Sequence, residues 1–500
     1  MRIERYLHDS AARDGAKTAI VSGDVRLSYA QFLDLSARMA ATLTAHGVAR
    51  GDRVLVLLDN GWRMAVSVFA AWMAGAVVCP LNPSTKSARL ARIAGDSEPA
   101  LVIAESRLER LIEGIAELAA LPRLVAGETG SFDTGLEAAP LAPQAWPDTD
   151  LALLIYTSGS TGEPKGVMLA HENVDAAARS IAFYLENTAS DVILVALPMS
   201  FGYGLNQLVT AVLSGATLVI EKSFAFPQAI FEKIRDERVT GLPLVPAMAA
   251  MAMQARGLDP ALFASLRYVT SAAAPLPLAH LDWLRTLLPH ARVYCMYGQT
   301  ECTRATWLPP AEIDARRGSV GIAIPGTRAE VVDEAGDPVP PGRVGELAIS
   351  GPHVMRGYWR NETATRRALR PGPRGPRLHT GDLFKADVDG YLTFVARMDD
   401  IIKSRGEKVA PQAVEEVLCR MPGVAEALVV GIPHDILGQA VKAVIVAADA
   451  ALTERDILRF CAQNLEDHMV PKVVEFRDAL PRTDTGKASR RLALTTGTNA

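Results

Sequence analysis

Tyr156-Thr-Ser-Gly-Ser-Thr-Gly-Glu-Pro-Lys-Gly166 is the most informative stretch of the chain, and it directly follows an apolar run at residues 151–155. The order predicts a buried strand that leads into a glycine-rich loop. Glycines let backbone N–H groups approach a ligand closely, and hydroxyls and a lysine add donors and positive charge. The residues concerned are Thr157, Ser158, Gly159, Ser160, Thr161, Gly162, Lys165 and Gly166. Such a set of groups suits a polyphosphate.

Two other interpretations fit the residues of this loop less well. A Walker loop places Gly-Lys before Ser or Thr, whereas here Lys165 follows Pro164 and precedes Gly166, so a P-loop nucleoside triphosphatase does not fit. A flexible Gly/Ser linker is the other alternative. Linkers do not usually combine so many hydroxyls with a Pro-Lys-Gly ending. The sequence therefore favours a phosphate-binding loop.

The chain around the loop has the pattern of an α/β protein. From about Ser28 to Glu301, short apolar runs alternate with helix-compatible stretches, which predicts parallel sheets covered by helices. The clearest runs are 192–197, 216–220, 267–271 and 292–296. The segment 64–81 is long enough to span a bilayer. Gly75 divides it, however, so we expect a helix at 64–74 and a buried strand at 76–81.

The pattern changes after residue 326. Short alternating runs predict antiparallel strands at 329–333, 344–350 and 391–394, with a Pro- and Gly-rich exposed loop at 370–377. The last hundred or so residues predict a small α+β domain. Its expected helices are 411–421 and 453–465, and its expected strands are 425–431, 441–446 and 473–476.

Composition sets further limits on the function. The 500 residues are 49% hydrophobic and 22% charged, which is typical of a folded globular protein. The net charge of −4 argues against a surface built to neutralise nucleic acid. The 5 cysteines form no Cys-x-x-Cys pair, so neither a disulfide framework nor a zinc site is expected. The charged N-terminus is unlike a cleaved leader, and we expect a cytoplasmic protein without an integral membrane segment.

Five motifs in a fixed order make the chain resemble the superfamily of adenylate-forming enzymes, which includes acyl-CoA synthetases, firefly luciferase and the adenylation domains of peptide synthetases. They are the loop at 156–166, Tyr297-Gly-Gln-Thr-Glu301, His379-Thr-Gly-Asp382, Arg397-Met-Asp-Asp400 with Lys403-Ser-Arg-Gly406, and Pro481-Arg-Thr-Asp-Thr-Gly-Lys487. The resemblance covers nearly the whole chain. It implies a large N-terminal α/β adenylation domain with a β-rich subdomain at 1–396, a hinge at 397–400, and a small mobile α+β domain at 401–500.

The resemblance implies a reaction in two steps. A carboxylate attacks the α-phosphate of ATP to give acyl-AMP and pyrophosphate, and a thiol then displaces AMP. Because charge builds on the α-phosphate, positioned cations and hydroxyl donors should matter more than a nucleophile on the protein. Lys487 is the expected mobile cation; its alternative is an exposed C-terminal lysine. The implied cofactors are ATP, Mg²⁺ and coenzyme A or phosphopantetheine.

The other expected site residues also come from the resemblance. Glu301 would be the Mg²⁺ ligand, or alternatively a solvated carboxylate at a helix start. Asp382 would accept from the ribose hydroxyls, or alternatively serve as a turn residue after Gly381. Thr300 would donate to the α-phosphate, and Tyr297 and Arg397 would add nucleotide contacts.

The hinge is expected at Asp399, about which the small domain would rotate between the two steps. That rotation would bring Lys487 to the site first and the 403–408 segment second. The basic cluster of Lys403, Arg405 and Lys408 would meet the phosphates of coenzyme A, or alternatively form a solvated loop.

The chain departs from the family pattern where the acid would bind. Ser271-Ala-Ala-Ala-Pro-Leu276 stands where acyl-CoA relatives usually have Ser-Gly-Gly-Ala-Pro-Leu, so Ala272 and Ala273 would narrow the pocket. Ala396 and Leu378 also replace residues common in relatives. No acidic residue lies between Leu197 and Ile220, where amino-acid-activating relatives carry an Asp. An acid without an α-amino group is therefore expected, because a buried ammonium without a partner is costly.

Three functions remain open at this point. The leading one is an acyl-CoA synthetase. The second is a ligase that loads the phosphopantetheine of a carrier protein, and the third is a catalytically silent nucleotide-binding protein. The apolar pocket would include Phe201, Tyr203, Met248 and Met251, unless these side chains belong to the core.

Overall fold

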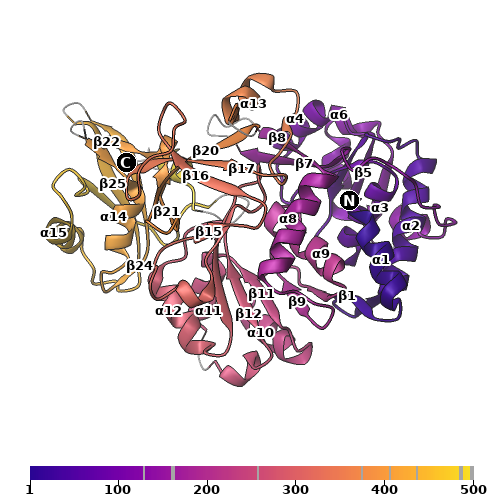
Figure 1. The fold of residues 1–500 in the computed structure, drawn as a ribbon, viewed down its shortest axis with the longest axis horizontal. Coiled ribbons are helices and arrows are strands. Elements are labelled where there is room, and N and C mark those ends of the chain that lie inside the picture. The colour runs from indigo at the N-terminus through magenta and orange to yellow at the C-terminus, as the bar shows by residue number, and fades with distance from the viewer. Residues whose placement is uncertain are drawn as a thin grey trace. The chain divides into compact units, whose positions relative to one another are not determined.

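The computed structural model describes residues 1–127, 130–158, 164–255, 258–372, 375–404, 407–434, 437–482 and 488–495. The chain forms two compact units. The first contains Met1–Ala329 and Ile349–His379, and the second contains Glu330–Ala348 and Thr380–Ala500. The α/β fold class is confirmed (Figure 1). The domain limits of 396 and 401 stay a prediction.

The first unit contains a nine-stranded sheet in the order β15-β14-β13-β12-β11-β9-β10-β1-β2. Pairing is parallel from β13 to β1, as the apolar runs predicted, and antiparallel at β2, β14 and β15. The strands are β1 (Thr18–Ser22), β2 (Val25–Ser28), β9 (Val192–Val195), β10 (Thr217–Ile220), β11 (Gly241–Leu244), β12 (Tyr268–Ser271), β13 (Arg292–Tyr297), β14 (Thr306–Trp307) and β15 (Ile322–Ala323).

A seven-stranded sheet has the order β18-β8-β7-β4-β3-β5-β6. Its strands are β3 (Arg53–Leu57), β4 (Val77–Pro80), β5 (Leu101–Glu105), β6 (Arg123–Ala126), β7 (Leu151–Ser158), β8 (Pro164–Ala170) and β18 (Gly357–Tyr358). The expected division at Gly75 is confirmed: helix α3 (Trp62–Met73) precedes it, β4 follows it, and Gly75 has φ of 75°. Within the described residues, no helix has the length and apolar character needed to cross a bilayer.

Helices pack around both sheets. Trp72 of α3 anchors one of these contacts, because its indole N–H donates to the carbonyl of Ala152 in β7 at 2.8 Å. Helices α8 and α9 contact each other, and Figure 1 shows them side by side. The α-helices of this unit are α1 (Glu4–Asp14), α2 (Tyr29–Ala45), α3, α4 (Ser87–Ser97), α5 (Glu109–Glu113), α6 (Ala116–Ala119), α7 (Ser131–Gly135), α8 (His171–Tyr184), α9 (Gly202–Ser214), α10 (Pro227–Asp236), α11 (Pro246–Met253), α12 (Leu278–Leu287) and α13 (Glu362–Ala368).

The expected antiparallel strands are present as β16 (Arg328–Val332), β17 (Val344–Ser350) and β21 (Leu392–Arg397). They belong to a sheet in the order β16-β17-β20-β19, where β21 pairs with β20. The two remaining strands are β19 (Leu369–Arg370) and β20 (Arg377–Ala386).

The C-terminal part has its own apolar core, in which Val414, Leu418 and Val429 are buried. Strand β24 is longer than the predicted 425–431, because its pairing with β25 continues to the hairpin contact of His434 with Gly438. The elements are β22 (Ile402–Ser404), β23 (Glu407–Val409), α14 (Pro411–Leu418), β24 (Val424–His434), β25 (Gly438–Ala447), α15 (Glu454–Asn464), β26 (Val473–Phe476) and α16 (Arg490–Thr495).

A buried histidine of the first unit should make stability depend on pH. Burial lowers the pKa of His353 from 6.5 to about 4, so the unfolded chain binds a proton that the folded chain does not. The contribution of the neutral His353 to stability is therefore fully present above pH 6.5, and it is lost as the pH falls towards 4. We expect a loss of about 2 kcal/mol in the free energy of unfolding between about pH 8 and about pH 5.

Urea titrations of the wild type and His353→Gln at both pH values measure this loss. The variant should lose less stability on acidification, whereas His434→Gln, at an exposed position, should behave as the wild type. His171, whose pKa burial also lowers, leaves a residual slope in both variants. Equal slopes in the wild type and His353→Gln would contradict the assignment.

Candidate active site

The order of the nine-stranded sheet indicates where a ligand binds. The chain leaves β9 for β10 on one side, and it leaves β11 for β12 on the other side. In open α/β sheets, ligands bind beyond the carboxyl ends of strands whose connections diverge in this way. The segments that begin at this edge contain Tyr203 after β9, Met248 after β11, and Ala272 and Ala273 after β12.

The predicted pocket residues differ in their surroundings. The Tyr203 hydroxyl lies 2.7 Å from the Thr270 hydroxyl and donates to the Thr270 carbonyl at 3.1 Å. Met248 is buried, whereas Met251 is 37% exposed. Phe201 directly precedes α9. Their contact with an acid stays a prediction.

The two alanines that replace glycine have different roles in the fold. Ala272 is buried in an apolar cluster with Tyr184, Tyr268 and Met296. Ala273 has φ of 76°, in the left-handed region that glycine adopts at no steric cost. The glycine usual at this position therefore has a backbone reason, and the alanine here carries strain.

The Tyr297-to-Glu301 motif forms the end of β13 and the turn that follows it. Its alternative reading as a helix start is wrong, because Thr300 and Glu301 lie in the turn. Gly298 is required there, since a Cβ atom would lie 2.6 Å from the Thr303 carbonyl oxygen. The half-buried Thr300 and Glu301 are held beyond the carboxyl end of the sheet.

Tyr358 is a site residue that the sequence did not reveal. Its hydroxyl donates to Oε1 of Glu301 at 2.9 Å, and burial and the Glu301 charge raise its pKa. The Lys165 ammonium lies 5.4 Å from the centre of the Tyr358 ring. Tyr358 thus brings together two predicted site residues, Lys165 and Glu301. The only sequence signal was an aromatic pair, Tyr358-Trp359, after Gly357.

Two antiparallel strands flank the predicted loop. Strand β7 extends to Ser158 and the chain returns as β8 from Pro164, with Thr157 opposite Lys165. Pro164 is tolerated because it is the first residue of its strand. The sequence predicted the strand before the loop but not the strand β8 that follows it. Gly159, Ser160, Thr161, Gly162 and the side chain of Ser158 lie outside the described residues.

Asp382 and Arg397 meet in the second unit. They are partners in the pairing of β20 with β21, and Arg397 Nε lies 3.4 Å from Asp382 Oδ1. Asp382 is only 3% exposed and lies within β20, so its alternative reading as a turn residue is wrong. Gly381 donates its N–H to Glu346 Oε1 at 3.0 Å. Ala396 and Leu378, which depart from the family pattern, are both buried.

The predicted hinge residue is at the surface. Asp399 is exposed in a 3₁₀ helix, Met398–Asp400. Its neighbour Asp400 accepts from Arg490 Nη1 at 2.9 Å, and Arg490 Nη2 donates to Glu415 at 2.6 Å. Lys403 is exposed in β22. Three predicted groups, Lys487, Arg405 and the Lys408 side chain, lie outside the described residues.

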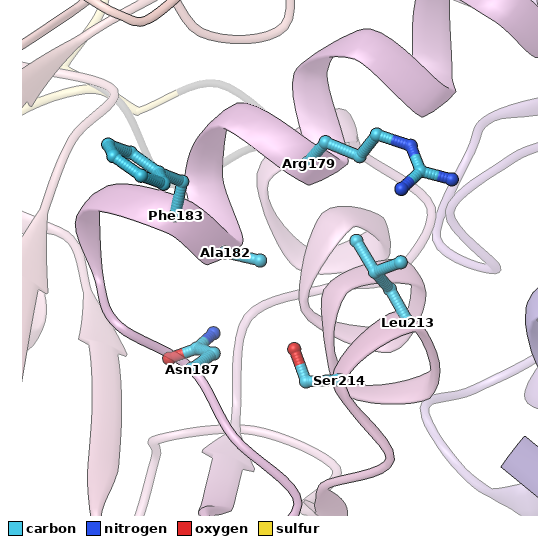
Figure 2. Close-up of a pocket in the computed structure, with 6 residues that line it drawn as sticks. All are labelled: Arg179, Ala182, Phe183, Asn187, Leu213 and Ser214. Carbon is cyan, nitrogen blue, oxygen red and sulfur yellow. The ribbon is translucent and has the colours of Figure 1, made fainter.

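A surface hollow of about 330 Å³ lies next to α8 and α9. Its lining residues are Arg179, Ala182, Phe183, Asn187, Leu213 and Ser214. Figure 2 shows the Asn187 and Ser214 side chains facing each other across it. Since α9 begins after the carboxyl end of β9, its last residues lie towards the opposite edge of the sheet. The hollow is therefore not part of the candidate site.

Comparison with known families decides the assignment. A model described as AMP-binding enzyme matches residues 7–359, and one described as AMP-binding enzyme C-terminal domain matches residues 413–487. The chain belongs to the AMP-binding enzyme family. The resemblance expected from the five motifs is thus confirmed.

The relatives are CoA ligases. A feruloyl-CoA synthase from Amycolatopsis sp is 35% identical over 477 residues, which are 94% of this chain and 94% of that protein. An indoleacetate–CoA ligase from Aromatoleum aromaticum is 33% identical, and the match covers 98% of this chain and 97% of that protein. ATP-bound MatB from Rhodopseudomonas palustris has a TM-score of 0.91 at 31% identity, covering 99% and 98% of the two chains.

The AMP-binding enzyme described here is accordingly an AMP-forming ligase that makes an acyl-AMP and then a CoA thioester. Loading of a carrier protein and a silent nucleotide-binding role are not favoured. Within the described ranges, no group of three His, Cys, Asp or Glu side chains is placed to hold a metal ion.

The two alanines after β12 should respond to glycine in opposite directions. Ala273→Gly should raise the free energy of unfolding by roughly 0.5–1 kcal/mol, because relief of the left-handed strain exceeds the entropy that glycine adds to the unfolded chain. Ala272→Gly should lower it by about 1 kcal/mol, because a buried methyl group is lost. Chemical denaturation of both variants measures the difference. Destabilisation in both would show that Ala273 is not strained.

Proposed function

We propose that this ligase activates a carboxylic acid without an α-amino group and transfers the acyl group to coenzyme A. The observation that carries the proposal is the assembly of Lys165 and Glu301 around Tyr358. It supports a site in which a cation and a carboxylate act on the phosphates of one nucleotide. The same proposal includes the roles of the individual site residues, the domain limits (1–396 and 401–500) and the cytoplasmic location.

Magnesium fits the carboxylate of Glu301. Tyr358 donates to Oε1, which leaves Oε2 for a cation, and magnesium bound with ATP typically takes one or two carboxylates together with phosphate oxygens. When bound, the ion would neutralise charge on the phosphates. Thr300 would donate to the α-phosphate from the same turn. The 157–165 hairpin would contact the outer phosphates through its backbone N–H groups and Lys165.

The second unit would bind the nucleoside and supply the moving parts. Asp382 would accept from two ribose hydroxyls, and Arg397, already beside it, would orient the carboxylate and contact the nucleotide. Lys487 would bridge the attacking carboxylate and the α-phosphate during the first step. Rotation about Asp399 would then replace it with the 403–408 segment for attack by the thiol of coenzyme A.

A panel of carboxylic acids tests the overall proposal. Acid-dependent release of pyrophosphate is measured with and without coenzyme A and with a phosphopantetheinylated carrier protein. We expect pyrophosphate release with at least one acid, and a thioester product with free coenzyme A. Absence of acid-dependent release across the panel would overturn the proposal. Transfer to the carrier protein alone would overturn the choice of acceptor.

Lys487→Ala should separate the two half-reactions. We expect adenylate formation to fall by about 100-fold or more, because the developing charge on the α-phosphate loses its cation, whereas thioester formation from supplied acyl-AMP should change little. Single-turnover assays of each step measure this. Lys472→Ala removes an exposed lysine elsewhere in the same unit and should affect neither step. Equal losses in both steps for Lys487→Ala would contradict a role confined to adenylation.

Tyr358→Phe should lower the catalytic efficiency with MgATP. The change keeps the ring beside Lys165 but removes the hydrogen bond to Glu301, which frees that carboxylate to rotate. We expect kcat/KM for MgATP to fall by about tenfold, the value of one hydrogen bond to a charged group. Tyr6→Phe, which removes a phenol–carboxylate hydrogen bond to Asp175, is the matched control and should not change this constant. An unchanged magnesium dependence in Tyr358→Phe would separate Tyr358 from the metal site.

A further inference from the structure

Arg304 is a buried arginine close to the candidate site. It follows Glu301 by three positions and lies between the motif turn and β14. Arg304 is only 3% exposed. Thr303, which precedes it, has φ of 59°, a left-handed conformation that is uncommon for a β-branched residue. The chain therefore bends sharply to place Arg304 inside the protein.

The guanidinium has no ionic partner in the part of the chain that the structure describes. Among the described residues, no ion pair involves Arg304. Arg304 Nε is buried without a hydrogen-bond partner. An arginine cannot release its proton to relieve this cost. An isolated buried charge is strongly unfavourable, so buried arginines are normally paired with a carboxylate or a phosphate. Such a site suits an anionic ligand.

The surroundings of Arg304 offer only partial compensation. Its guanidinium lies 4.9 Å from the centre of the Tyr203 ring and interacts with the Tyr184 hydroxyl, contacts that stabilise the charge but supply no anion and leave Nε–H without a partner. The Tyr203 hydroxyl is already engaged with Thr270, and burial raises the pKa of Tyr203 to about 12, so this residue is neutral. Tyr203 therefore cannot supply the negative charge.

The position connects Arg304 with the expected acid pocket. Tyr203 follows β9 at the edge where the sheet connections diverge, and its partner Thr270 lies two residues before Ala272. Ser271 ends β12, and its hydroxyl is also buried without a hydrogen-bond partner. Within the described residues, a guanidinium nitrogen of Arg304 and the hydroxyl of Ser271 thus both lack hydrogen-bond partners in the neighbourhood of Tyr203 and β12.

We infer that Arg304 binds a second carboxylate of the acid substrate, so that the preferred substrates are dicarboxylic acids. The inference rests on the proposed function, because it assigns the far end of the acid whose near carboxylate attacks ATP. Arg304 would act as a specificity-determining residue. A planar guanidinium can form two parallel hydrogen bonds to a carboxylate, and it would be left buried and unpaired by an acid that ends in a methyl group.

Matched acid pairs test this inference on the wild type. Succinate, glutarate, adipate and terephthalate are compared with butyrate, valerate, hexanoate and p-toluate by acid-dependent pyrophosphate release. We expect kcat/KM for the best dicarboxylic acid to exceed that for its monocarboxylic partner by about 100-fold or more. Higher values for the monocarboxylic partners would overturn the inference but leave the proposed function intact. No release with any acid would instead count against the proposed function.

Arg304→Met assigns the preference to this side chain. The methionine fills similar space without a charge, so activity with dicarboxylic acids should fall by about 100-fold while activity with their partners is retained or rises. Arg304→Lys should fall in between, because a lysine keeps the charge but loses the two-pronged geometry. Arg366→Met, at an exposed position, is the control for loss of an arginine and should match the wild type.

Thermal unfolding without substrate separates a binding role from a structural one. If Arg304 awaits a ligand, Arg304→Met removes an unpaired buried charge, and the melting temperature should stay the same or rise. A large fall in melting temperature, with an unchanged preference in Arg304→Lys, would show that Arg304 only supports the fold. Added dicarboxylic acid with ATP should stabilise the wild type more than Arg304→Met.

Discussion

The hydrogen bond from Tyr358 to Glu301 joins the nine-stranded and the seven-stranded sheet of the first unit. Glu301 follows β13 of the nine-stranded sheet, and Tyr358 lies in β18 of the seven-stranded sheet. A backbone bond from the Met355 N–H to the Glu301 carbonyl, at 2.8 Å, strengthens the same connection. Because β18 also pairs with β8, the hairpin that carries Lys165 is held to the turn that carries Thr300 and Glu301. The proposed phosphate site depends on this connection.

The site combines groups that cost stability with groups that fix their positions. Ala273 is held at positive φ and Arg304 is buried without an anion, and neither arrangement favours the folded chain by itself. They persist because the sheet around them is tightly packed: Tyr184 stacks on Trp307 with ring centres 4.9 Å apart. Strain and unpaired charge beside a packed scaffold are typical of binding sites that a ligand completes.

The second unit uses charge differently. Arg490 is half-buried, and it donates to Asp400, to Glu415 and to the Val429 carbonyl, so its charge is compensated within the unit. This network fixes one end of the segment that contains Asp399, while Asp399 itself is exposed. An exposed residue next to one that is tied down agrees with the proposed hinge, because a few dihedral angles are enough to absorb such a motion.

The sequence by itself determined the α/β class, the main strands and the family, because these depend on local periodicity and on motifs whose residues are adjacent in the chain. It predicted Lys165, Glu301, Asp382 and Arg397 as site residues for the same reason. Tertiary structure alone decided that Tyr358 connects Lys165 with Glu301, since 57 residues separate Tyr358 from Glu301 and no local pattern reports such a contact. It also decided that Arg304 is buried and has no ion pair among the described residues, because the pairing of a charge depends on which distant segments fold against it.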